Sequence, residues 1–133
     1  MNDRYQRGVE VIQQLSSESL EQFLTSRVAE VAPDFARMAI EFSFGDIYAR
    51  DELDLETREI AAIAALASLG HGGPQLRMHV AAALKLGITK GKVVEILMQS
   101  AIYGGFPAAL NALTECHDLL VDGDGVACAS CCA

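Results

Sequence analysis

The sequence contains no tryptophan, and aromatic residues of all kinds make up only 6% of its 133 residues. Because hydrophobic residues nevertheless make up 51%, a core has to be filled by closely packed alanine and aliphatic side chains. A chain of this length fits a single domain with one core. We expect part of the small-residue apolar surface to be buried between subunits as well as within one.

Basic residues are also scarce. Ten lysines and arginines face 18 acidic residues, which gives a net charge of -8, and the basic residues form no cluster along the chain. Such a protein would repel phosphate backbones, so we predict that it does not bind nucleic acid.

Long hydrophobic runs are missing as well. The longest apolar run, "IAAIAALASLG" at residues 60–70, is shorter than the ~20 residues that a membrane helix needs. The first 15 residues are charged and amphipathic and lack the apolar centre of a secretory signal. These absences favour a cytoplasmic protein without a membrane partner.

Cysteine is rare in the body of the chain, where only Cys116 occurs, but three cysteines lie in the final "CASCCA". This distribution is not that of a secreted domain held together by disulfides, and it favours a reducing compartment. Residues 122–133 are rich in glycine and small residues, so we predict a flexible Cys-rich tail after a single domain at residues 1–121. Cys128, Cys131 and Cys132 could exchange disulfides, bind a soft metal or have no chemical role.

What the sequence does contain is the three- and four-residue apolar spacing of helices, without strand-like alternation. Proline, glycine and capping residues mark where the helices begin and end, with Pro33, Asp54, Pro74 and Thr89 as helix starts. The predicted helices cover residues 3–15, 16 or 17 to 31, 33–50, 55–69, 74–86, 90–103 and 107–120.

The helix that follows Asp54 is apolar or small on every side from Ile60 to Leu69, and this pattern predicts a helix buried all round. The alanine-rich runs "AAIAALA" and "VAAAL" on either side of residues 70–74 predict a close antiparallel pair of helices. The glycines and the proline between them then form a helix-to-helix turn.

Two residues on these helices are candidates for proton chemistry. His79 falls on the apolar stripe of Leu76 and Val80, so its ring should point inward, where it is either a structural histidine or a catalytic one. Glu59 is the last charged residue before the apolar stretch and either faces solvent at the helix start or lines a pocket. On adjacent antiparallel helices the two could meet near the turn and form an acid–base pair.

Three further residues could bind a ligand. Arg58 and Arg77 could receive a substrate carboxylate through paired hydrogen bonds, or could form surface salt bridges. His71 lies in the turn beside two glycines. As a metal ligand it would need His79 and a third group that the sequence does not fix, so we predict no metal site.

Three segments together resemble the carboxymuconolactone decarboxylase family in order and spacing: "DIYARDELDLETREIAAIAALASLG" (46–70), "PQLRMHVAAALKLGITKGKVVEIL" (74–97) and "YGGFPAALNAL" (103–113). The resemblance extends over roughly residues 35–120, and "RYQRG" at 4–8 is similar to the amino-terminal region of the family. It implies an all-α, AhpD-like bundle of about six or seven helices that assembles as a homo-oligomer, a hexamer or trimer.

The resemblance also implies a reaction. Family members remove carbon dioxide from γ-carboxymuconolactone without a cofactor, in the β-ketoadipate pathway of aromatic catabolism. The peroxidase branch of the superfamily carries a C-x-x-C pair ahead of the site histidine, but its two positions fall here on Gly72 and Gln75. The decarboxylase branch is therefore favoured.

Carried over to this chain, the resemblance implies His79 as the proton donor and Glu59 as the residue that orients it. Arg77 or Arg58 would bind the carboxylate of a small lactone substrate, and His71 would line the same pocket. Two alternatives stay open: a thiol-dependent peroxidase or disulfide reductase that uses the tail cysteines, and an oligomeric family member without catalytic activity.

Overall fold

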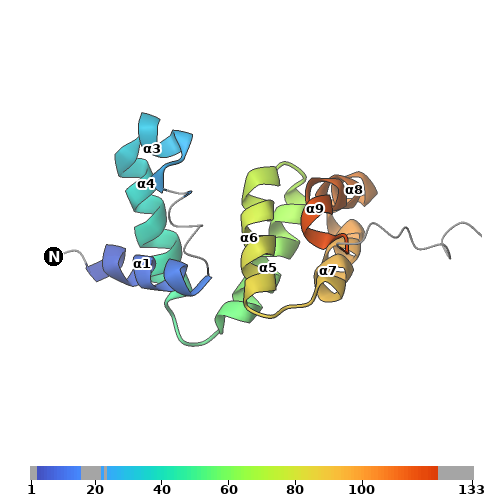
Figure 1. Ribbon diagram of the computed structural model, residues 1–133, viewed down its shortest axis with the longest axis horizontal. Helices are drawn as coiled ribbons and strands as arrows, with labels where there is room; N and C mark the ends of the chain where they lie inside the picture. Colours follow the sequence, from blue (N-terminus) through green and yellow to red (C-terminus); the bar gives the residue numbers. More distant parts are fainter. Residues whose placement is uncertain (1–2, 16–21, 23, 123–133) are drawn as a thin grey trace, which may run out of the picture.

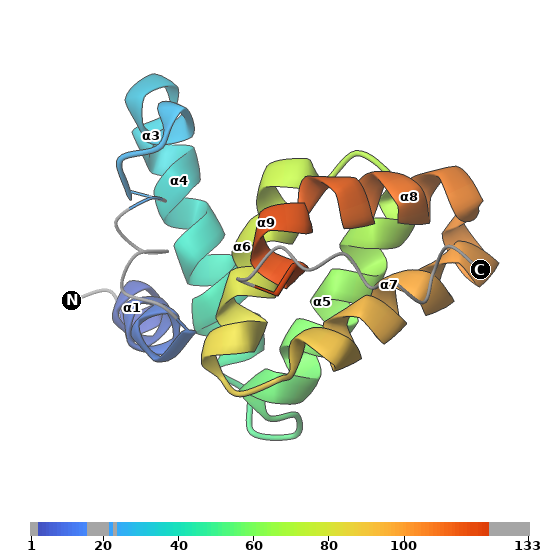
Figure 2. The same ribbon diagram turned by 45° about the vertical axis from the view of Figure 1, so that its right-hand side comes forward.

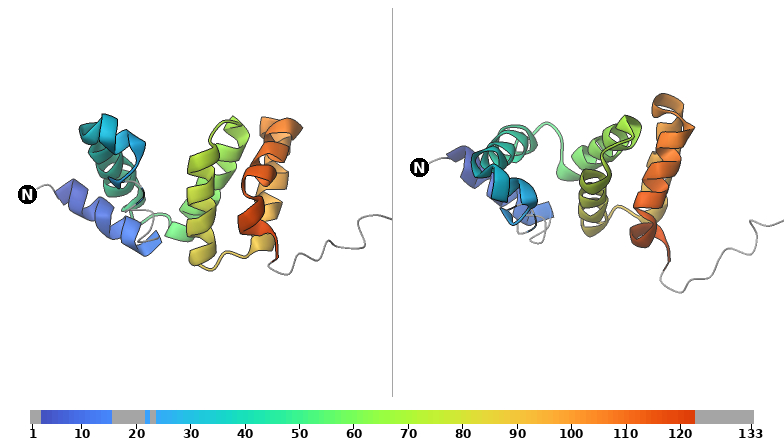
Figure 3. Two further views of the ribbon diagram at one scale, coloured as in Figure 1. Left: turned by 45° about the horizontal axis from the view of Figure 1, so that its top comes forward. Right: turned by 90° about the horizontal axis from the view of Figure 1, so that it is seen from above.

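The computed structural model describes residues 3–15, 22 and 24–122, and this part of the chain is helical, with no strand. The predicted all-α fold is confirmed. The helices form two lobes that lie side by side, with α1, α3 and α4 in one and α5 to α9 in the other (Figures 1 and 3). The elements of the first lobe are α1 (Asp3–Leu15), α3 (Arg27–Val31), α4 (Pro33–Ala39) and η1 (Ile40–Tyr48). Those of the second are α5 (Leu55–Leu69), α6 (Gly73–Lys85), α7 (Lys90–Gly104), α8 (Phe106–Glu115) and α9 (His117–Leu120).

In the first lobe, α4 begins at Pro33 and continues without a break into η1, which is wound as a π-helix. The predicted helix over 33–50 is thus confirmed, but its second half has the wider winding that often occurs at functional sites. The helix crosses α1 closely, because Gly8 and Gly45 lie at the crossing. A Cβ on Gly8 would lie 2.5 Å from the carbonyl oxygen of Ile40, so the contact leaves no room for a side chain.

The helix predicted to run unbroken to Val31 is interrupted. The chain turns at Thr25 and Ser26, and the Ser26 hydroxyl accepts a hydrogen bond from the Ala29 amide to start α3. A serine that caps a new helix start is a local signal that the apolar spacing masked. Residues 16–21 and 23, where the predicted helix begins, lie outside the described residues, as do the tail residues 123–133.

In the second lobe, the predicted ends of the helices over 55–69, 74–86 and 90–103 are confirmed to within one residue, whereas the helix predicted over 107–120 is divided at Cys116 into α8 and α9. The Asp54 carboxylate accepts a hydrogen bond from the Thr57 amide at the start of α5, and the Thr89 hydroxyl accepts one from Lys92 at the start of α7. Gly70 ends α5 with a φ of 80° and Gly87 follows α6 with a φ of 100°, both in the left-handed region that favours glycine. The antiparallel pair α5 and α6 stands at the centre of the molecule, between the first lobe and α7 to α9 (Figure 2).

The helix α5 is not buried all round, which corrects the prediction from its composition. Glu59, Ile63 and Ala67 are buried on one stripe, whereas Ile60 and Leu69 are 37% and 60% exposed. In the single chain, α6, α7 and α8 cover only part of the helix circumference. The core of the second lobe is formed by aliphatic and small side chains that include Ile63, Ala67, Leu76, Val80, Ala83, Ile88, Val93, Leu97, Ala112 and Cys116.

A smaller cluster joins the two lobes. It consists of side chains from α1 and η1, together with Ala82 of α6. The helix α6 thus contributes buried side chains to both clusters. Among the described residues, none of the helices combines the length and the apolarity that crossing a membrane requires.

Candidate functional site

The site is built around a contact between α5 and α6. Glu59, in the second turn of α5, is fully buried, and one of its carboxylate oxygens, Oε2, lies 2.7 Å from Nδ1 of His79 in the middle of α6. The predicted contact between Glu59 and His79 is confirmed, although it lies along the helices rather than at the turn. The His79 side chain is 13% exposed, so the pair is closed on the Glu59 side and open on the histidine side.

The hydrogen bond fixes the orientation of the imidazole ring. With Glu59 as a carboxylate, which can only accept a hydrogen bond, Nδ1 of His79 is the donor in this contact. This leaves Nε2 as the ring nitrogen available for chemistry. A distance of 2.7 Å is at the short end for such bonds, as expected when one partner is charged.

Tyr48, at the end of η1, completes the surroundings of the pair. Its ring centroid lies 6.4 Å from that of His79 and 5.1 Å from that of Phe44. Burial raises the pKa of the Tyr48 hydroxyl, and the neighbouring Glu59 carboxylate raises it further. The hydroxyl therefore stays protonated and remains a hydrogen-bond donor.

A cleft of about 530 Å³ lies between the α4–η1 helix and α6, and both His79 and Tyr48 line it. Its volume is in the range typical of small-molecule sites. The other described residues that line it are Gln22, Ser26, Val28, Phe35, Ala36, Ala39, Ser43, Phe44, Pro74, Gln75 and Met78.

Arg58 lies next to the pair but does not line the cleft. Its guanidinium carbon is 5.7 Å from the centroid of the Tyr48 ring, a cation–π geometry, and its Nη2 donates a hydrogen bond to the Arg50 carbonyl at 3.0 Å. Two buried atoms here have no hydrogen-bond partner among the described residues: Nε of Arg58 and Oε1 of Glu59. Polar atoms of this kind favour a ligand or a water molecule as an additional partner.

The structure does not bring Arg77 to the pair. Its guanidinium binds both carboxylate oxygens of Asp118, at 2.6 and 2.9 Å, and also donates to the Glu115 carbonyl. This bond lowers the pKa of Asp118 to about 2 and raises that of Arg77. Arg77 thus ties α6 to α8 and α9, the surface-pair alternative that the sequence left open.

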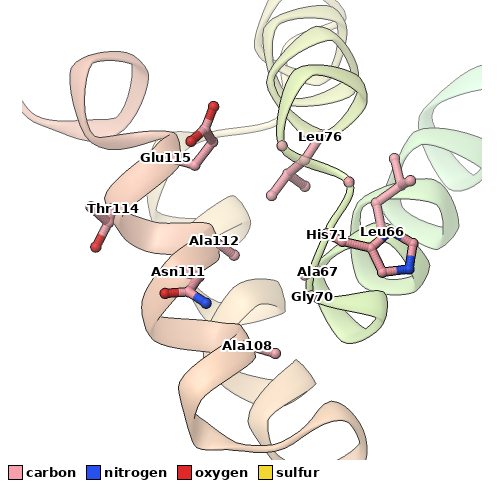
Figure 4. Close-up of a pocket in the computed structure, with 12 residues that line it drawn as sticks. Leu66, Ala67, Gly70, His71, Leu76, Ala108, Asn111, Ala112, Thr114 and Glu115 are labelled. Carbon is pink, nitrogen blue, oxygen red and sulfur yellow. The ribbon is translucent and has the colours of Figure 1, made fainter.

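His71 does not lie in the cleft of His79, so the prediction that both line one pocket is wrong. His71 is exposed and lines a second cavity, of about 360 Å³, between the α5–α6 turn and α8. Figure 4 shows it on the turn, with Asn111, Thr114 and Glu115 on the α8 side. The two histidines are eight residues apart on either side of the start of α6, and that helix directs them to different surfaces.

Among the described residues, no group of three or more histidine, cysteine or acidic side chains is placed to hold a metal ion. Cys116 is fully buried in the second lobe, and burial raises the pKa of its thiol. Cys128, Cys131 and Cys132, on which the thiol-dependent alternative depends, lie outside the described residues.

Sequence reasoning missed Tyr48, because it treated the helix over 33–50 as apolar and singled out no residue on it. The signal that could have found it is a single hydroxyl group on an otherwise apolar stripe, at the end of the helix that precedes Glu59. That signal is weak, because Tyr48 comes close to His79 only when the two lobes pack side by side.

The fold and the site define an all-helical protein in which a buried carboxylate–histidine pair borders a cleft of small-molecule size, an arrangement that can transfer a proton. The model of the carboxymuconolactone decarboxylase family matches residues 33–117, and the chain belongs to this family.

Two relatives are similar over most of their length. The 4-carboxymuconolactone decarboxylase of Acinetobacter baylyi is 30% identical over 124 residues, which cover 92% of each chain. An uncharacterized 15.0 kDa protein of Paracoccus denitrificans is 33% identical over 107 residues, 80% of each chain. A decarboxylase-like or AhpD-like function therefore fits the chain.

Proposed function

We propose that this protein is a cofactor-independent decarboxylase that acts on an unsaturated lactone carboxylate of the γ-carboxymuconolactone type, also called 4-carboxymuconolactone. The observation that carries the proposal is the 2.7 Å contact between buried Glu59 and His79, with the histidine lining a cleft of about 530 Å³. The similarity to a 4-carboxymuconolactone decarboxylase supports the choice of substrate.

The reaction needs an electron sink and a proton. When the bond between the ring carbon and the carboxylate breaks, its electron pair moves through the conjugated double bond to the lactone carbonyl, and carbon dioxide leaves. The resulting dienolate carries its negative charge partly on oxygen and partly on carbon. Protonation at carbon gives the enol-lactone product, so the protein has to stabilise the dienolate and deliver one proton.

His79 delivers that proton from Nε2. In the donating form both ring nitrogens carry a proton, and the Glu59 carboxylate holds the one on Nδ1 and balances the positive charge. After the transfer His79 is neutral, keeps its Nδ1 proton toward Glu59, and regains the Nε2 proton from solvent. Glu59 acts through His79 and is a positioning residue.

In this reaction Tyr48 stabilises the negative charge that develops on the substrate. Its hydroxyl belongs to a residue that lines the cleft, and its raised pKa keeps it protonated while the dienolate exists. Of the two arginines predicted to bind the carboxylate, Arg58 lies outside the cleft lining and takes part only by holding the Tyr48 ring. Arg77 is bound to Asp118 and takes no part in the proposed reaction.

The proposal is tested by incubating the purified protein with γ-carboxymuconolactone and following the release of carbon dioxide. We expect His79→Ala to lower kcat by roughly 10²- to 10⁴-fold, the usual contribution of a general acid. The matched control is His71→Ala, which removes the same side chain from the other cavity and should leave kcat unchanged. Absence of release by the folded wild type, or full activity of His79→Ala, would refute the proposal.

A further inference from the structure

The lining of the cleft indicates what kind of substrate fits it. The α4–η1 helix contributes a mainly apolar wall, and α6 contributes Met78 and Pro74 on the opposite side. Phe35 is 64% exposed and Val28 48% exposed, so both would lose solvent contact against an apolar ligand. The apolar lining residues are Val28, Phe35, Ala36, Ala39, Phe44, Pro74 and Met78.

The polar groups of the cleft are mostly uncharged. Ser43 and Gln75 lie on the two facing helices and can bond to a lactone carbonyl or ring oxygen, and Gln22 and Ser26 lie at the α3 side. Only His79 and Tyr48 are ionisable among the described lining residues. Of these two, only His79 can carry a positive charge.

All ten lysines and arginines of the chain lie within the described residues, and each of them lies outside the cleft lining. Several are held elsewhere by named partners: Arg7 by Asp46, Arg37 by Asp34, Arg77 by Asp118, and Lys90 by the Val121 carbonyl. Arg58, the cation next to the site, is held on the Tyr48 ring and on the Arg50 carbonyl.

The negative charge of Glu59 makes the cleft still less favourable for an anionic ligand. Its carboxylate is fully buried directly behind His79, so a negative ligand in the cleft meets one positive imidazolium that is already paired with one negative group. A substrate with one carboxylate loses that charge as carbon dioxide during the reaction. A second carboxylate would stay in the cleft, partly desolvated and without a cationic partner, which is costly.

We infer that the cleft selects an unsaturated lactone with a single carboxylate, the one that is lost, and an apolar substituent packed between Phe35, Ala39 and Met78. The inference rests on the proposed decarboxylase function and narrows its substrate class. In γ-carboxymuconolactone the substituent is an acetate arm that carries a second negative charge. Compared with that substrate, the protein prefers a butenolide carboxylate in which an alkyl arm of the same length replaces the acetate arm.

The kinetic test compares two substrates that differ only in this arm, carboxymethyl or propyl, on the same butenolide carboxylate. We expect kcat/KM to be at least roughly tenfold higher for the propyl compound, the usual scale for one well-matched apolar group, with the difference mainly in KM. Equal values, or a preference for the carboxymethyl compound, would overturn the inference.

A charge variant tests the cause of the preference. Gln75→Lys places a cation in the lining and should raise kcat/KM for the carboxymethyl compound relative to the propyl compound by roughly tenfold. Gln99→Lys is the control, because it adds the same charge at an exposed position of α7. If both variants change the ratio equally, net charge rather than the cleft determines the preference, and the inference fails.

A binding measurement separates this inference from the proposed function. The two ring-saturated analogues, which cannot lose carbon dioxide by this route, are titrated into the wild-type protein by calorimetry. We expect tighter binding of the propyl analogue even if neither unsaturated lactone is turned over, a result that would refute the reaction but retain the ligand class. Tighter binding of the carboxymethyl analogue, or binding of neither, would refute the ligand class.

Discussion

At the scale of single residues, the roles of the site groups follow from their contacts with one another rather than from each residue alone. Tyr48 follows an apolar stretch, and by sequence it could equally be a core side chain. In the structure its ring lies between Phe44, Arg58 and His79, and its hydroxyl has a raised pKa because it is buried near Glu59. These contacts give a tyrosine that remains a hydrogen-bond donor in a cleft where negative charge would develop.

Replacing Tyr48 by phenylalanine should therefore lower kcat while preserving the ring contacts. A loss of roughly 10²- to 10³-fold is expected for a donor to a developing oxyanion, with a small change in KM. Because its pKa is raised, Tyr48 does not ionise in the working range, and the alkaline limb of the pH–rate profile should be the same in Tyr48→Phe and in the wild type. Tyr103→Phe, at a position 79% exposed, serves as the control. An unchanged kcat in Tyr48→Phe would remove the hydroxyl from the mechanism.

At the scale of helices, the crossing of α1 and η1 determines where the cleft wall lies. Gly8 and Gly45 allow the two backbones to touch, and Nε and Nη2 of Arg4 bind the Asp46 carboxylate, with the shortest distance 2.6 Å. The "RYQRG" motif thus has a structural explanation in this chain: its first arginine, Arg4, and its glycine, Gly8, hold α1 against the helix that carries Phe44 and Tyr48.

Substituting Gly8 by alanine should destabilise the protein, because the new methyl group would meet the Ile40 carbonyl oxygen at 2.5 Å. Such overpacking costs about 1–3 kcal/mol in the free energy of unfolding, which denaturant titration measures. Gly91→Ala is the matched control: the nearest atom to its new methyl group is the Thr89 hydroxyl oxygen at 3.9 Å. Its stability should be unchanged or higher by up to about 1 kcal/mol. Equal effects of the two substitutions would contradict the close crossing.

The pair of Arg77 and Asp118 acts at the same scale, since it joins α6 to α9. Its hydrogen bonds lower the pKa of Asp118 to about 2, below the ~3.9 of an unfolded aspartate. A carboxyl group whose pKa is lower in the folded than in the unfolded protein stabilises the fold when the pH is above the unfolded pKa. This stabilisation is lost as the pH falls through the folded pKa. The wild type should thus be more stable than Asp118→Asn near pH 7, and the difference should shrink between about pH 4 and pH 2. A difference independent of pH would show that the carboxylate charge is not the cause.

The sequence predicted the local features of these helices and missed those that depend on packing. Asp54, Thr89, Gly70 and Gly87 act on their own helix ends, so their roles could be inferred from neighbouring residues alone. The contact of Glu59 with His79 followed from the antiparallel arrangement. The partner of Arg77, by contrast, lies 41 positions away at Asp118, and no local pattern indicates it.

At the scale of the whole molecule, much apolar surface stays uncovered in the single chain. Along α7 and the start of α8, Ile102 is 75% exposed, Tyr103 79% and Phe106 67%. The composition predicted that some small-residue apolar surface would be buried between subunits, and the uncovered face of α5 explains why that helix looked fully buried by sequence. The homo-oligomer stays a prediction.

If this surface joins subunits, a charge placed in it should separate them. We expect sedimentation velocity to show a homo-oligomer for the wild type and a smaller species for Ile102→Glu. Val31→Glu alters a position that is 86% exposed on α3 and should leave the assembly intact. A monomeric wild type, or an unchanged assembly in Ile102→Glu, would contradict the prediction.

The central claim is that Glu59 and His79 work as one proton-transferring unit, and a double-mutant cycle on kcat/KM tests it most directly. We predict that Glu59→Gln and His79→Gln each lower kcat/KM, and that the double variant is no slower than His79→Gln alone, because Glu59 acts only through the histidine. Circular dichroism would establish that all four proteins are folded. If the losses of the two single variants multiply in the double variant, the residues act independently and the claim is wrong.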